Sequence, residues 1–140
     1  MSKPGFLSFS SSELMPQEEV LEVKTAKSDL KIGIPKETSF QEKRVPLTPD
    51  GVLLICDNGH DVVIESGAGE GANYTDADFS EAGAKIVYSP EEVYESDIIL
   101  KVEPPSLKEL NMMKHRQTLI SALQLKAQKK SYFQKLMEKK

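Results

Sequence analysis

The chain has 140 residues, of which 39% are hydrophobic and 29% charged, and its net charge is −4 at pH 7. This length suits one domain with a single core, and because acidic and basic residues are interspersed, nucleic acid is not an expected partner. The apolar runs are far shorter than the roughly 20 residues of a membrane span, and the single cysteine, Cys56, excludes an intramolecular disulfide or a thiolate metal cluster within one chain.

Residues 1–29 form a distinct N-terminal segment with serine, proline and mixed charge. They lack the sustained period of a strand and the apolar core of a signal peptide, so we expect a tail and a cytoplasmic protein. A short helix over 16–25 would place apolar side chains on one face. The segment is either a mobile arm or an arm packed on a partner subunit.

From Leu30 onward, short apolar runs alternate with helical segments. The apolar runs are rich in β-branched residues, and runs of this kind predict strands. We expect these strands at 30–35, 60–66, 85–88, 97–102 and 118–123. The fourth run is almost continuously apolar, which is typical of a strand in a parallel sheet that is buried on both faces.

Capping residues predict the helices between these strands. Thr48 followed by Pro49 begins one helix, which ends at Gly59, and Thr75 begins another. Further helices are expected after Ser89, at 107–113 and at 129–140, the last with Tyr132, Phe133, Leu136 and Met137 on one stripe. The alternation predicts an α/β fold, a doubly wound, mainly parallel sheet of Rossmann or flavodoxin type with about five strands flanked by helices.

Ligands of such sheets bind outside the carboxyl ends of the strands, so the residues there are candidate site residues. Arg44 follows the first strand, and its guanidinium fork could hold a substrate carboxylate or pair with a surface acid. Lys101 could polarise a carbonyl oxygen in a cleft or form an ion pair with Glu103. Gln124 ends the fifth strand and can form hydrogen bonds without titrating.

Three glycines, Gly67, Gly69 and Gly71, follow the second strand in SGAGEGA. A dinucleotide fingerprint would open a helix within the motif and place an acid at the end of the next strand. Here the next strand ends in Val87 and Tyr88. The pattern therefore favours a structural turn with positive φ over cofactor binding.

The two histidines lie at the opposite edge of the predicted sheet. His60 begins the second strand and His115 precedes the fifth, so both are on the amino side. We expect them to be surface residues, and the chain then offers no obvious general base at the carboxyl edge.

Several sequence blocks together resemble a known family. KIGIPKETSFQEKRVPLTPDGV, ESGAGEGANYTDADFSEAGAKIV, DIILKVEPP and QTLISALQL follow one another without a large gap from Leu30 to the end. Their order resembles the N-terminal domain of alanine dehydrogenases and of the nicotinamide nucleotide transhydrogenase α subunit, with closer agreement to the dehydrogenases. The resemblance implies that residues 30–140 are the substrate-side domain, truncated before the domain that binds most of the NAD.

The resemblance also implies roles for the candidate residues. Arg44 matches the arginine that binds the carboxylate of pyruvate or alanine, and Lys101 the lysine that holds the substrate carbonyl oxygen. Gln124 stands where the dehydrogenases carry a histidine. A glutamine cannot donate a titrating proton, so other groups would carry that step.

The implied reaction of the parent protein is the reversible oxidative deamination of L-alanine to pyruvate and ammonia with NAD, the fragment alone being inactive. Two alternatives remain. The first is a transhydrogenase domain with a membrane partner, in which Gln128 could match a glutamine near the nicotinamide. The second is a non-catalytic domain that binds a carboxylate. Apolar surface left bare by the missing domain predicts a homo-oligomer.

Overall fold

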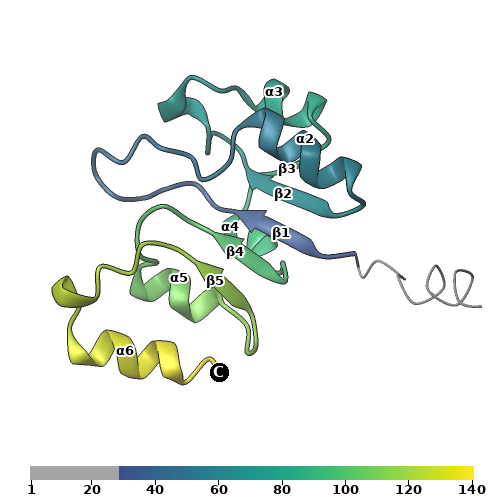
Figure 1. The fold of residues 1–140 in the computed structure, drawn as a ribbon. Helices are drawn as coiled ribbons and strands as arrows, with labels where there is room; N and C mark the ends of the chain where they lie inside the picture. The colour runs from purple at the N-terminus through teal and green to yellow at the C-terminus, as the bar shows by residue number, and fades with distance from the viewer. Residues whose placement is uncertain (1–28) are drawn as a thin grey trace, which may run out of the picture.

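The structure is a computed structural model that describes residues 29–140. The predicted N-terminal tail and its short helix lie outside the described residues. Among the described residues, five strands form one parallel sheet in the order β3-β2-β1-β4-β5 (Figure 1). The order reverses between β1 and β4, which is the switch point of a doubly wound sheet. The predicted fold class is confirmed.

The strands are shorter than the apolar runs that predict them. Their bounds are β1 Lys31–Ile34, β2 Asp61–Glu65, β3 Lys85–Val87, β4 Ile98–Leu100 and β5 Thr118–Ile120. β1 pairs with β2 from Lys31 opposite Asp61, and β4 pairs with β5 from Ile98 opposite Thr118. The prediction that a strand continues to residue 123 is wrong. Gln124, which adopts the left-handed region at φ 47°, lies in the connection beyond β5.

All five predicted helices are present, those after Thr48, Thr75 and Ser89 begin where the capping residues predict, and the last is shorter than the predicted 129–140. They are α2 Pro49–Asp57, α3 Asp76–Glu81, α4 Pro90–Val93, α5 Leu107–Met112 and α6 Lys130–Met137, with short 3-10 turns at Glu70–Ala72 and Leu125–Ala127. The side chains of Thr48, Thr75 and Ser89 each accept a bond from a backbone amide of the first helical turn. α5 has a cap that we did not predict, a reciprocal box between Ser106 and Glu109.

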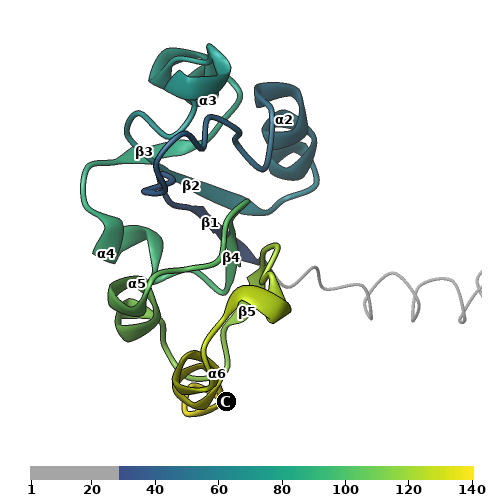
Figure 2. The same ribbon diagram turned by 90° about the vertical axis from the view of Figure 1, so that its left-hand side faces the viewer.

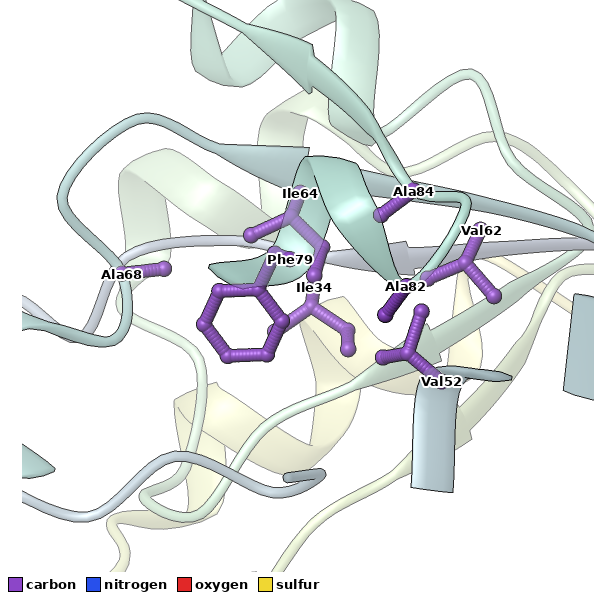
Figure 3. Close-up of a cluster of buried hydrophobic side chains, with 8 residues drawn as sticks. All are labelled: Ile34, Val52, Val62, Ile64, Ala68, Phe79, Ala82 and Ala84. Carbon is purple, nitrogen blue, oxygen red and sulfur yellow. The ribbon is translucent and has the colours of Figure 1, made fainter. Parts of the chain in front are cut away.

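Helices cover both faces of the sheet, with α2 and α3 on one face and α4 and α5 on the other (Figure 2). The alternation of side chains along β2 produces this arrangement, since Val62 and Ile64 belong to one buried cluster and Val63 to another. The larger cluster lies under α2 and α3 (Figure 3). Its members are Ile34, Val52, Val62, Ile64, Ala68, Phe79, Ala82 and Ala84.

A second cluster joins α5 and α6 to β4 and β5. Tyr94, Ile99, Leu110, Met113 and Tyr132 are its buried members, with Phe133 and Leu136 packed against them. The predicted stripe on the last helix is therefore correct for three of its four residues. The prediction is wrong for Met137, because this residue is 65% exposed. None of the helices in residues 29–140 is long and apolar enough to cross a membrane.

The glycine-rich segment after β2 is a structural turn, as predicted. Only Gly67 among its three glycines has a positive φ, of 76°, so the expected conformation holds at that position alone. Gly69 and Gly71 are required for another reason. A Cβ on Gly69 would collide with the ring of Phe79, and one on Gly71 would approach the backbone of Lys43 to 2.8 Å.

Candidate active site at the switch point

The candidate site lies at the carboxyl ends of β1 and β4, where the strand order reverses. The loop after β1 carries Glu37, Glu42 and Arg44, and the segment after β4 carries Lys101 and Glu103. Glu37 crosses from one strand end to the other. Its Oε1 accepts a 2.7 Å bond from the backbone amide of Val102, and its Oε2 lies 3.1 Å from Lys101 Nζ.

Arg44 is held by a neighbouring carboxylate. Its Nε and Nη2 donate to the two Glu42 oxygens at 2.8 and 2.6 Å, and the Glu42 carboxylate also accepts from the Arg44 amide. These bonds to Arg44 lower the pKa of Glu42 to about 2, and Glu42 in turn raises the pKa of the guanidinium. The Arg44 side chain is still 70% exposed. Its third nitrogen, Nη1, is therefore available to an external acceptor.

A small polar pocket of about 90 Å³ opens beside Arg44. At about 30 Å³ per molecule, this is room for roughly three waters. Its charged lining is Lys36, Lys43 and Arg44 against Glu37, Glu42 and Glu70, with the glycine turn as the opposite wall. The three cations equal the three carboxylates in number, so the charges of the lining balance.

Lys101 is the most deeply buried charge of the site. Its side chain is 1% exposed, and Nζ donates to Glu37 Oε2 at 3.1 Å and to Glu109 Oε1 at 3.0 Å. A buried ammonium costs several kcal/mol unless opposite charges surround it, and here two carboxylates do. An ammonium has three donors, so one N–H remains beyond these two bonds.

Glu109 is fixed from both sides. Burial raises the pKa of its carboxyl. The bond from the Ser106 backbone amide and the charge of Lys101 lower this pKa by more than burial raises it, so the net shift is downward. Burial also raises the pKa of Tyr94, whose hydroxyl is buried without a hydrogen-bond partner among the described residues. Glu109 therefore stays ionised beside Lys101.

Glu103 has a different role from the predicted one. The alternative of an ion pair between Lys101 and Glu103 is wrong, because Lys101 faces Glu37 and Glu109 instead. Glu103 Oε1 lies 3.6 Å from Arg44 Nη2, and Glu103 Oε2 accepts a 3.0 Å bond from the Gln124 amide. Glu103 thus links two of the predicted site residues, Arg44 and Gln124.

The structure brings the three predicted site residues to one edge, but in two separate networks. The exposed residues Arg44 and Gln124 share a network with Glu42 and Glu103, while Lys101 belongs to the buried network of Glu37 and Glu109. Neither Lys101 nor Gln124 lines the 90 Å³ pocket, although Glu37 does and contacts Lys101.

The histidines lie away from this site, at the predicted amino edge. His60 Nδ1 accepts a bond from the Leu30 amide at 3.3 Å, and His115 is exposed in the turn before β5. Among the described residues, no group of three or more His, Cys, Asp or Glu side chains is placed to hold a metal ion.

Four carboxylates hold the charged side chains of the site, and a local sequence signal exists for only one of them. The spacing of Ser106 and Glu109 is that of a capping box, which places Glu109 in the first turn of a helix that follows a buried strand. The contacts of Glu37 and Glu42, and the pairing of Glu103 with Arg44, depend on how the long loop after β1 folds back over the sheet. No periodic pattern records such a contact.

These features define a doubly wound α/β domain with an exposed arginine, paired with Glu42, at its switch point. Residues 33–140 match the family described as "Alanine dehydrogenase/PNT, N-terminal domain". The chain belongs to this family.

Relatives and solved structures agree with this assignment. The alanine dehydrogenase of Mycobacterium tuberculosis (strain ATCC 25618 / H37Rv) is 43% identical over 99 residues, which are 70% of this chain and 27% of the relative. That of Staphylococcus epidermidis (strain ATCC 12228 / FDA PCI 1200) is 41% identical over 101 residues, 72% of this chain and 27% of the relative.

Two solved structures share the fold. An L-alanine dehydrogenase superposes with a TM-score of 0.75 at 36% identity, covering 79% of this chain and 30% of that one. A transhydrogenase from Sinorhizobium meliloti superposes with a TM-score of 0.63 at 31% identity, covering 66% and 28%. The chain therefore spans less than a third of the length of the proteins it matches.

Proposed function

We propose that this domain supplies the substrate-binding half of an NAD-dependent alanine dehydrogenase, which interconverts L-alanine with pyruvate and ammonia. The observation that carries the proposal is the position of Arg44, whose exposed guanidinium borders a small polar pocket at the switch point. Identity above 40% to alanine dehydrogenases over this domain supports the choice of reaction. The expected compartment is the cytoplasm.

Arg44 binds the substrate carboxylate in this proposal. A carboxylate can engage Nη1 directly or replace Glu42 in the two parallel bonds of the fork. The pocket volume of about 90 Å³ favours an acid of only a few heavy atoms. The ion pair with Glu42 keeps the guanidinium oriented toward the pocket until the substrate arrives.

Lys101 holds the substrate carbonyl oxygen. Glu37 and Glu109 use two of its N–H donors, and the third N–H is the one offered to the substrate. Gln124, held by Glu103, adds a hydrogen bond at the same edge but no titrating proton. Because Lys101 is buried behind Glu37, substrate contact requires Glu37 to shift.

The nicotinamide cofactor fits poorly on the described residues. The glycine turn is filled by Phe79 and by the backbone of Lys43, so it has no cradle for a pyrophosphate. NAD would bind mainly to another part of the whole protein, and hydride transfer would need that part.

A binding experiment on the 140-residue chain tests the role of Arg44. Removing a charged hydrogen-bond donor costs about 1.5–3 kcal/mol, so we expect Arg44→Ala to weaken pyruvate binding roughly 10- to 100-fold. The measurement is a pyruvate titration followed by NMR, with Arg116→Ala, a second exposed arginine outside the site, as the matched control. Equal affinities of the Arg44→Ala and unsubstituted chains would contradict the assignment.

Transhydrogenation is the second candidate, favoured by Gln124 at the position where the dehydrogenases carry histidine and by the transhydrogenase of similar fold. Activity assays on the protein that includes the nucleotide-binding part distinguish the two reactions. Alanine-dependent NAD reduction supports the dehydrogenase. Hydride exchange between two nicotinamide nucleotides without turnover of alanine supports the transhydrogenase.

A further inference from the structure

An apolar groove opens at the amino edge of β5, opposite the candidate site. It has a volume of about 470 Å³ and lies between the end of α5, the start of β5 and the end of α6. Its apolar lining is Met113, Leu119, Leu136 and Met137. Met137 is 65% exposed on the groove wall.

The rim of this groove is positively charged. Lys114, Arg116, Lys139 and Lys140 line it, and no Asp or Glu side chain is among its lining residues. Lys139 is fixed there, because its Nζ donates to the carbonyl oxygens of Asn111 and Met113. An apolar floor with a cationic rim suits a segment that carries both apolar and acidic side chains.

The N-terminal segment enters the domain at the same edge. The amide of Asp97 donates to Lys31 O at the start of β1, and the amide of Thr118 donates to Asp97 O at the start of β5. Since neighbouring strands lie about 4.8 Å apart, the start of β1 is roughly 10 Å from the start of β5. Arg116, on the groove rim, is two residues before Thr118.

Residues 13–23, ELMPQEEVLEV, match the groove in character. Their apolar residues include Leu14, Val20, Leu21 and Val23, and their charged residues are Glu13, Glu18, Glu19 and Glu22, all acidic. Residues 24–29 can span roughly 20 Å when extended, which is enough to reach the groove from β1. The family match begins at residue 33, so residues 13–23 are outside the part of the chain shared with the family.

We propose that residues 13–23 dock in this groove of their own chain. Their apolar side chains cover Leu136 and Met137, and their carboxylates meet the cationic rim. The segment thereby covers apolar surface beside the edge strand β5.

Methyl NMR of the 140-residue chain tests the proposal. We expect nuclear Overhauser effects (NOEs) between the methyl groups of Val20 or Leu21 and the Met137 methyl group, unchanged on dilution. A mixture of labelled and unlabelled chains separates contacts within one chain from contacts between two. If the NOEs are absent, or arise only between chains, the proposal is overturned.

Two matched variants extend the test. Docking also predicts NOEs from Val20 or Leu21 to the groove residues Leu119 and Leu136. Met137→Asp should abolish these NOEs, whereas Leu54→Asp, on α2 and equally exposed at 65%, should leave them intact. Lys114→Glu combined with Lys140→Glu should also abolish them, and adding Glu18→Lys and Glu19→Lys should restore them. If the charge reversal does not restore the contacts, docking of residues 13–23 is contradicted. If it does restore them, the loss in the rim variant was electrostatic, because new charges on the segment would not repair a structural defect of the rim.

Discussion

The two halves of the sheet differ in how completely they are covered. Under α2 and α3, the cluster on β1 and β2 buries Ile34, Val52, Ile64 and Phe79 completely. On the other side of the switch point, β4 and β5 have three residues each, and Ile120, Leu125 and Met137 stay more than half exposed. The first half, called the closed half, has the larger buried cluster, although Leu54 and Tyr88 on its surface are exposed. The second half, called the open half, has the smaller cluster and borders the apolar groove.

This difference separates the part with the larger buried core from the part with an open sheet edge. Among the described residues β5 pairs only with β4, so its outer edge is open, and the apolar groove lies beside it. The candidate site lies between the halves, taking Glu37 and Arg44 from the first and Lys101 and Gln124 from the second. Substitutions in the two halves should therefore have unequal costs.

The largest effect is expected in the closed half. Phe79 is fully buried, stacks edge-on with Tyr74 at 6.0 Å and fills the space above Gly69. Phe79→Ala should lower the free energy of unfolding by about 3–5 kcal/mol, measured by urea denaturation. Tyr88→Ala, at an 85% exposed aromatic residue, is the control, with a change within about 0.5 kcal/mol. Equal losses at both positions would contradict the closed core.

A smaller effect is expected where the halves meet. Glu109→Gln leaves Lys101 with one carboxylate partner and should cost about 1–3 kcal/mol at pH 7. Because the folded pKa of Glu109 is lowered, its contribution is present above about pH 4.5 and is lost as the pH falls through the folded value.

The pH dependence of unfolding distinguishes this pair from a surface pair. Stability measured from pH 7 to pH 3 should fall less steeply for Glu109→Gln than for the unsubstituted chain. The control is Glu95→Gln, which removes an exposed carboxylate that lies 3.9 Å from Lys114. This substitution should leave the slope unchanged, because exposed ion pairs contribute little to stability. A slope unaffected by Glu109→Gln would show that the carboxyl is not held in its ionised form.

The smallest effect on stability is expected at the open half. Ile120→Ser together with Leu125→Ser should change the free energy of unfolding by less than about 0.5 kcal/mol per site, because both side chains are mostly exposed. The same pair should reduce self-association, since it removes exposed apolar surface. Light scattering at micromolar concentration measures this. A 140-residue chain that is monomeric before the substitution would contradict the predicted homo-oligomer.

The sequence predicted the elements of the fold because the signals for them are local. Thr48, Thr75 and Ser89 cap the helices they were expected to cap, and five apolar runs correspond to five strands. Strand ends were less predictable. The run of residues 118–123 extends past the last strand residue, Ile120, because Ala122 and Leu123 lie where the chain leaves the sheet.

The position of Arg44 and Lys101 at the carboxyl edge follows from the sequence alone, since the alternation of strand and helix determines which edge receives the loops. The partners of these charges were decided only by the tertiary structure. Lys101 contacts Glu37, 64 residues away, and not its near neighbour Glu103, because β1 and β4 become adjacent only when the sheet reverses its order. Charges pair through space without a repeat along the chain, so the folding of the sheet, and not sequence spacing, determined that the buried lysine is held by two carboxylates.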